Sequence, residues 1–153
     1  MVYKHYVVHP QSATLPAQAA CAGHLQGKFS EMEHLIWTKG YNAGRNFSQD
    51  NLDSMAKELN LNMDKFKSDM SGPCAQTVRK DQRELSQVGT RGTPAFYING
   101  RFISGAQQPD AFKRVIDEEL KKANGRIAQG TPVEQYYDKF VLKEGLKKLE
   151  DPK

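Results

Sequence analysis

The chain has 153 residues and a mass of 17.2 kDa, with 38% hydrophobic and 26% charged residues and a mean hydropathy of −0.71. These values are typical of one globular domain with a core, and no apolar run is long enough to cross a membrane. The net charge of +4 arises from cations spread among acidic residues. We find no basic stripe interleaved with aromatics, which argues against nucleic-acid binding.

The first half of the chain predicts one strand followed by helices. Tyr3 to His9 is rich in Tyr and Val and is stopped by Pro10, so a strand is predicted, with no signal peptide before it. From about Ala13 to Thr38, apolar residues recur at steps of three and four, which predicts a helical region. The step Gln26-Gly27-Lys28 favours a break into two helices.

Three further helices are predicted from their starting residues. Ser48 and Asn62 are N-cap residues, each preceding apolar residues at helical spacing. Gly72-Pro73 predicts the start of the third helix, since proline is tolerated in a first turn. The apolar stripe of that helix begins at Cys74, and Gly89 ends it.

The second half predicts a hairpin and two helices. Asn99-Gly100 lies between two runs of strand-forming residues, which is typical of a two-residue type I′ turn. Thr93-Pro94 precedes the first run, at a strand entry where a cis bond is compatible with proline. A helix is predicted from Pro109 to Gly125, and a capping box at Thr131-Pro132-Val133-Glu134 predicts a last helix.

This order of elements is one strand, several helices, a hairpin and two helices. A sheet of three strands covered by that helical mass gives a helix-rich α/β or α+β fold. The chain contains two cysteines, Cys21 and Cys74, which are separated by 53 positions. That spacing matches neither a dense disulfide framework nor a paired zinc motif.

Several motifs in the same order resemble the DsbA-like family of thiol–disulfide oxidoreductases. They are the cis-proline loop and hairpin from Gly92 to Phe102, and the segments 9–32, 59–66 and 104–112. The resemblance implies a thioredoxin-like sheet with a DsbA-type helical insertion. It further implies one domain over residues 1–153, divided into a strand (3–9), an insertion (13–90), a loop, hairpin and helix (93–125), and an extra helix (131–149).

One part of the family pattern is missing from this sequence. In that family a central strand and a helix that begins with Cys-x-x-Cys come before the strand placed here at Tyr3 to His9. We therefore expect an N-terminally truncated fold and favour a fragment or a mis-started reading frame. Two alternatives stay open: the strand at Tyr3 to His9 moves into the vacant position, or a partner chain or a second copy supplies the element.

The resemblance assigns substrate binding to Gly92, Thr93 and Pro94, with the backbone of Thr93 meeting an extended substrate. Cys74 is the candidate catalytic thiol, because a helix N-terminus favours a thiolate. We favour core packing for both Cys74 and Cys21 over this role and over a disulfide between them. Cys21-x-x-His24 lacks a second pair, so no metal site and no cofactor are expected.

The implied reaction is dithiol–disulfide exchange on cysteine-containing proteins or peptides, in the periplasm or cell envelope. Because the chain has no Cys-x-x-Cys, we expect it to be inactive as an oxidoreductase on its own. The alternative is a non-catalytic peptide-binding module or chaperone-like assembly factor on the same fold. A glutathione-handling enzyme on this fold has no specific feature in its favour.

Overall fold

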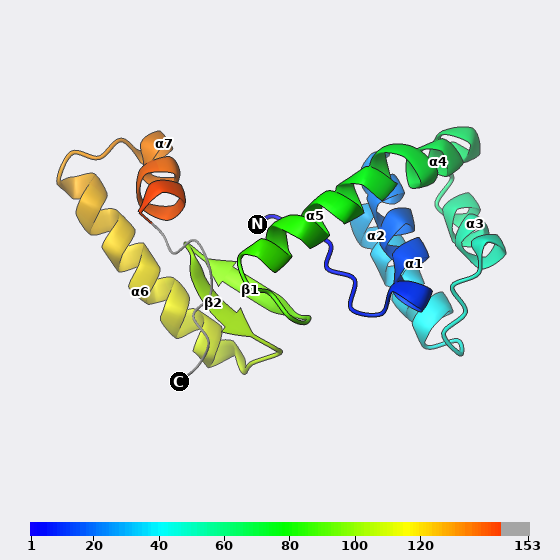
Figure 1. Ribbon diagram of the computed structural model, residues 1–153, viewed down its shortest axis with the longest axis horizontal. Coiled ribbons are helices and arrows are strands. Elements are labelled where there is room, and N and C mark those ends of the chain that lie inside the picture. The colour runs from blue at the N-terminus through cyan, green and yellow to red at the C-terminus, as the bar shows by residue number, and fades with distance from the viewer. Residues whose placement is uncertain (145–153) are drawn as a thin grey trace. The chain divides into compact units, whose positions relative to one another are not determined.

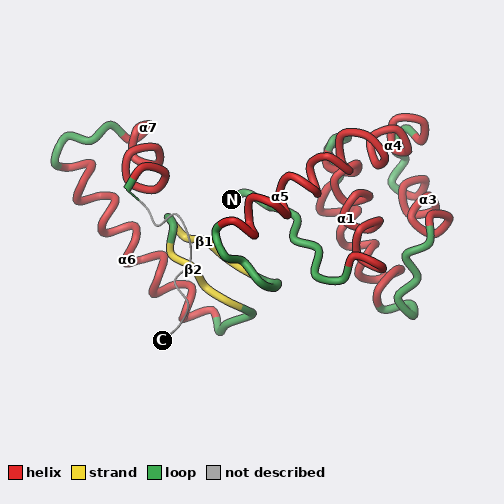
Figure 2. The backbone as a smooth tube through the Cα atoms, viewed as in Figure 1, coloured by secondary structure: helices red, strands yellow, loops and turns green. Residues whose placement is uncertain are grey.

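The computed structural model describes residues 1–144, and the chain divides into two compact units, Met1–Leu85 and Ser86–Lys153. The first unit is helical and the second contains a β-hairpin with helices (Figures 1 and 2). The boundary falls inside the last turns of a helix, whereas a single domain was predicted from the length of the chain.

The first unit is built from five α-helices, two of which are extended by π-helical turns. The helices are α1 (Pro10–His24), α2 (Phe29–Leu35), α3 (Gln49–Glu58), α4 (Met63–Asp69) and α5 (Ala75–Gln87). The π-helical turns are Ile36–Tyr41 after α2 and Met70–Cys74 between α4 and α5. In Figure 1, α1 and α2 lie next to each other, with α3 and α4 at the far end of this unit from the start of the chain.

Two glycines position α1 against α2. Gly27 has a φ of +74°, which lets the chain reverse between the helices, as the predicted break at Gln26-Gly27-Lys28 requires. A Cβ on Gly23 would lie 2.8 Å from the Cβ of Met32, so a larger residue there would push the two helices apart. The predicted division of this region is therefore confirmed.

The hydrophobic core of the first unit is contributed by α1 to α4 and the π-helical turn before α5. Its largest fully buried side chains are Phe66, Met32, Leu52, Met55 and Cys74. On α3 the buried residues Leu52, Met55 and Ala56 follow the predicted i, i+3, i+4 spacing. Ser48 and Asn62 cap α3 and α4 by accepting the backbone N–H groups of Asn51 and Lys65, as predicted.

The predicted strand at Tyr3 to His9 is wrong. This segment is extended but joins no sheet, and Pro10 begins α1 at a position where its missing N–H is harmless. Side chains of α5 take the place of a neighbouring strand: the N–H of His5 donates to Asp81 (2.9 Å) and that of Val7 to Gln82 (2.7 Å).

The second unit contains an antiparallel hairpin of β1 (Ala95–Ile98) and β2 (Arg101–Ser104). The sheet of the described residues thus has two strands, whereas three were predicted. Asn99 and Gly100 both have positive φ, at 46° and 86°, as the predicted type I′ turn requires. The predicted hairpin and its turn are confirmed.

The hairpin is followed by α6 (Pro109–Ala128), α7 (Val133–Tyr136) and a π-helical turn (Tyr137–Lys143). The α6 helix passes the predicted stop at Gly125, and the chain turns instead at Gly130, whose φ is +97°. The N-cap of α7 is Pro132 rather than the predicted Thr131. Residues 145–149 of the predicted last helix lie outside the described residues.

Candidate functional site

Gly92, Thr93 and Pro94 form the loop that enters β1 in the second unit. The peptide bond between Thr93 and Pro94 is cis, and both residues are exposed. The carbonyl of Pro94 accepts a 2.8 Å hydrogen bond from the N–H of Gly105, which extends the hairpin by one pair beyond Ala95 and Ser104. A Cβ added at Gly92 would meet no atom within 4 Å, so this loop is open on that side.

The register of the hairpin determines which backbone groups β1 leaves open. Ile98 pairs with Arg101 next to the turn, and residues that flank a two-residue turn exchange both of their hydrogen bonds. The backbone groups of Ile98 and Phe96 therefore point to β2, and those of Ala95 and Tyr97 point away from it. In the two-stranded sheet of the described residues, this outward edge continues directly from the loop at Thr93.

Side chains of the second unit fix this loop and hairpin in place. The hydroxyl groups of Thr90 and Tyr97 lie 2.7 Å apart, which ties the chain before the loop to β1. On the opposite face, Phe96 contacts Phe112 of α6 with ring centroids 4.8 Å apart. These polar and aromatic contacts hold the loop and β1 within the second unit.

Arg101 of β2 adds an ionic contact to α6. It donates to Glu118 and, at 3.3 Å, to Glu119. The hydrogen bond with Glu118 raises the pKa of the Arg101 guanidinium, and the same bond lowers the pKa of Glu118. Both groups stay charged over the physiological range, so this contact holds the hairpin against α6 at any ordinary pH.

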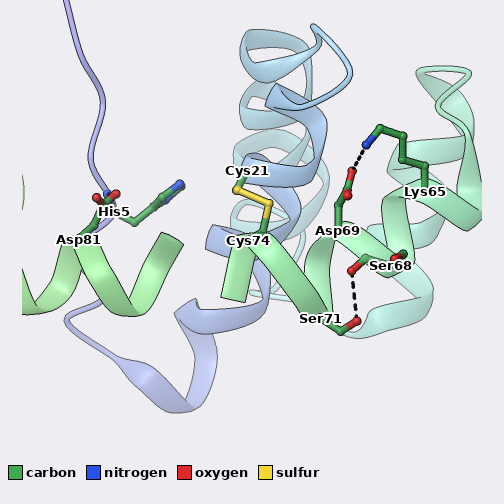
Figure 3. Close-up of a disulfide and its surroundings, with 8 residues drawn as sticks. All are labelled: His5, Cys21, Lys65, Ser68, Asp69, Ser71, Cys74 and Asp81. Carbon is green, nitrogen blue, oxygen red and sulfur yellow. Dashed lines mark hydrogen bonds and ion pairs between the residues drawn. A yellow bond between two sulfur atoms is a disulfide. The ribbon is translucent and has the colours of Figure 1, made fainter. Parts of the chain in front are cut away.

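The two cysteines lie in the first unit and form a disulfide. Cys21 of α1 and Cys74, at the end of the π-helical turn before α5, have Cα atoms 5.6 Å apart, within the usual range for such bonds (Figure 3). Both are buried, with exposed fractions of 6% and 0%. The favoured expectation of two unpaired core cysteines is therefore wrong, although their burial is as predicted.

The disulfide also removes the chemical basis for Cys74 as a nucleophile. Cys74 was expected in the first turn of a helix, but helical residues from Met63 onward precede it, so it does not lie at a helix N-terminus. Its sulfur carries no thiol, and Cys21 for the same reason offers no thiolate to a metal beside His24. Within residues 1–144 no group of three or more His, Cys, Asp or Glu side chains is placed to hold a metal ion.

A family model of the DSBA-like thioredoxin domain matches residues 4–117, from the extended N-terminal segment to the middle of α6. The chain belongs to this family. DSBA-like domains are of the thiol–disulfide oxidoreductase type, and the match confirms both the predicted resemblance and the predicted helix-rich fold class. The α7 helix lies outside the matched range.

A curated protein with a similar segment is the Na(+)/H(+) antiporter NhaA of Herminiimonas arsenicoxydans. It is 26% identical over 117 residues, which cover 76% of this chain and 18% of the antiporter. This chain therefore spans less than a fifth of the length of that relative. No solved structure matches the chain.

Within this DSBA-like domain the predicted site residues fall into two groups. Gly92, Thr93 and Pro94 are consecutive in the second unit, and Cys74 belongs to the first unit. Sequence reasoning missed the disulfide and the role of Asp81 as acceptor for the N-terminal segment. The sequence did contain one signal for the disulfide. Each cysteine lies on an apolar helical stripe that faces the core, and the chain has no third cysteine with which either could pair.

Proposed function

We propose that this DSBA-like chain presents the peptide-docking half of a thiol–disulfide oxidoreductase site and does not exchange disulfides by itself. One observation carries the proposal. The exposed Thr93-Pro94 loop leads into an open strand edge, while both cysteines of the chain are held in one buried disulfide.

The chemistry of exchange explains the second half of the proposal. A thiolate must attack a substrate sulfur in line, and a second thiol must then release the mixed disulfide. Cys21 and Cys74 are joined across the core of a helical unit, with almost no exposed surface. No Cys-x-x-Cys occurs in the sequence, so the chain lacks a pair that could take both roles.

The partners that we propose are extended, cysteine-containing segments of proteins. An extended segment gains backbone hydrogen bonds when it lies along an open strand edge, and Thr93 precedes such an edge here. A DSBA-like chain that binds such segments without exchanging disulfides would act as a peptide-binding module or a chaperone-like assembly factor. Ion transport is not proposed, because the antiporter match covers 18% of that protein.

We also propose an oxidising compartment, such as the periplasm, as the place of action. The Cys21–Cys74 disulfide supports this, because disulfides persist outside the reducing cytosol. Among the helices of residues 1–144, none has both the length and the apolar character needed to cross a membrane.

The proposal is tested with reduced dithiothreitol and insulin, and by titrating a labelled, cysteine-containing unfolded peptide. We expect no acceleration of insulin reduction over the reductant alone, together with measurable peptide binding. Thr93→Arg should weaken that binding about tenfold or more, since a long charged side chain would crowd the loop. The matched control is Thr131→Arg, which changes the other threonine that precedes a proline and should leave affinity unchanged.

Two results would overturn the proposal. Turnover of insulin that disappears in Cys74→Ala would show that the chain is catalytic. Equal peptide affinity in Thr93→Arg and the unmodified chain would show that the loop is not the docking site.

A further inference from the structure

The loop at Gly92-Thr93-Pro94 is anchored on both of its sides. Before the loop, Thr90 is 3% exposed, and its hydroxyl oxygen lies 2.7 Å from that of Tyr97. After the loop, the carbonyl of Pro94 accepts a 2.8 Å hydrogen bond from the N–H of Gly105. The exposed part of the loop therefore lies between two anchor points, and the first of these is a contact between side chains alone.

The chain around Thr90 has no regular backbone pairing of its own. The α5 helix ends at Gln87, Gly89 turns the chain with a φ of +93°, and β1 begins only at Ala95. The contact between Thr90 and Tyr97 closes this irregular stretch into a ring with a sequence separation of 7. Closing the ring excludes loop conformations that would otherwise be lost when a peptide binds.

Tyr97 reaches Thr90 from the face of the hairpin opposite to α6. Successive side chains of a strand alternate between its faces, and Phe96 packs on Phe112 of α6. The ring of Tyr97 packs on Phe102 of β2, with ring centroids 5.2 Å apart. Removal of the hydroxyl group alone leaves this ring contact in place, so the hydroxyl pair is separable from the packing.

We propose that Thr90 and Tyr97 are positioning residues for peptide docking, and that their hydroxyl pair holds the Thr93-Pro94 loop in its binding conformation. The inference rests on the docking proposed above and adds the side chains that prepare the loop for it. Neither hydroxyl has to touch the peptide, because the bond between them orders the loop before the peptide arrives. Its loss should weaken binding about threefold to tenfold, as expected for one hydrogen bond between uncharged groups.

The first experiment measures binding of a labelled, cysteine-containing unfolded peptide to the full chain and its variants. Tyr97→Phe and Thr90→Val should each bind the peptide about threefold to tenfold more weakly than the unmodified chain. Thr90→Ser retains a hydroxyl group and should retain the affinity. The combination of Tyr97→Phe with Thr90→Val should bind no more weakly than either single variant, because each change removes the same bond.

Two controls separate positioning from a general loss of stability. Arg101→Gln removes the ionic contact of β2 with Glu118, and should lower the urea midpoint of unfolding without changing peptide affinity. Tyr136→Phe removes the hydroxyl of a tyrosine in α7 whose ring packs on Phe140, and should change neither quantity. An affinity that falls as far in Arg101→Gln as in Tyr97→Phe would overturn the positioning role.

A second measurement tests the loop without any peptide. Trypsin cleaves after arginine, and the exposed Arg91 lies directly between Thr90 and the loop. Cleavage there requires the loop to leave its anchored conformation, so it should be about threefold to tenfold faster in Tyr97→Phe, as followed by mass spectrometry. Cleavage after the exposed Arg45 of the first unit should be unchanged. An equal rate at Arg91 in both chains would contradict the role of the hydroxyl pair.

Failure of the docking and failure of the hydroxyl pair give different results. If the unmodified chain bound no peptide, the docking would be overturned, and the positioning role with it. If the unmodified chain and Tyr97→Phe bound the peptide equally well, the docking would stand and the positioning role alone would be overturned.

Discussion

At the scale of single residues, Asp81 of α5 is the acceptor that holds the N-terminal segment. Its buried carboxylate receives the N–H of His5 and, at 2.9 Å, the ammonium group of Lys4. Glu84 lies 2.7 Å from the same ammonium group. The hydrogen bonds to Glu84 and Asp81 raise the pKa of Lys4, and the hydrogen bond from Lys4 lowers the pKa of Glu84, so this ion pair is present wherever the carboxylate is ionised and the ammonium group is charged.

His5, beside Asp81, makes the stability of the first unit depend on pH. Burial lowers the pKa of His5, with a further lowering from His24 and an opposing effect of Asp81. A lowered pKa means that the folded chain favours the neutral imidazole, so its contribution is complete above about pH 6.5 and is lost as the pH falls through the folded pKa. We expect the urea concentration at the unfolding midpoint to decrease as the pH is lowered below about 6.5. This decrease should be smaller in the His5→Gln variant. The matched control is His34→Gln, which changes an exposed histidine. If the unmodified chain, His5→Gln and His34→Gln showed the same pH dependence of the midpoint, His5 would not be its source.

At the scale of elements, the disulfide joins α1 to the start of α5 and closes a loop with a sequence separation of 53. In the chain-entropy account, a cross-link over this separation stabilises the fold by about 4 kcal/mol, chiefly by restricting the unfolded chain. We therefore expect the Cys21→Ala/Cys74→Ala double variant to be less stable than the unmodified chain by about 2–4 kcal/mol in urea unfolding.

A reductant provides the control for this measurement. Dithiothreitol at a concentration that opens the disulfide during unfolding should lower the midpoint of the unmodified chain toward that of the double variant. It should not change the midpoint of the variant, which contains no other cysteine. Equal midpoints for the oxidised chain and the variant would show that the bond contributes nothing to stability.

Which elements could be predicted depended on whether their signals were local. The N-cap at Ser48 and the turn at Asn99-Gly100 were predicted because a few adjacent residues determine their backbone geometry. The strand at Tyr3 to His9 failed because a strand needs a neighbour, and side chains of α5 took that role. The Cys21–Cys74 bond depends on how α1 meets α5, which helical periodicity does not specify.

The loop at Gly92-Thr93-Pro94 was located from the sequence because its residues are consecutive and its turn chemistry is distinctive. The state of the Cys74 sulfur could not be predicted for the opposite reason: core packing was correctly favoured, but the disulfide was not. Whether a thiol is free or paired depends on the position of a cysteine 53 residues away, and whether it lies at a helix N-terminus depends on where the preceding helix ends.

At the scale of the whole molecule, the two units differ in what stabilises them. The first has a buried core and a disulfide, whereas the described part of the second has aromatic and ionic contacts without a buried apolar side chain. Burial of apolar surface contributes about 25 cal/mol per Å², so the second unit, whose apolar side chains are only partly buried, gains less from this term than the first. Its free energy of opening should therefore be the smaller of the two.

We accordingly expect two classes of amide protection. Amides of β1, β2 and the first half of α6 should exchange at least tenfold faster than those in the middle of α1 and α5, as measured by hydrogen–deuterium exchange and mass spectrometry. The Cys21→Ala/Cys74→Ala variant is the control, because it should speed exchange in α1 and leave that of the hairpin unchanged. Exchange of hairpin and α1 amides at one common rate would mean that the units open as a single cooperative body, with stabilising contacts that the burial pattern of the second unit does not account for.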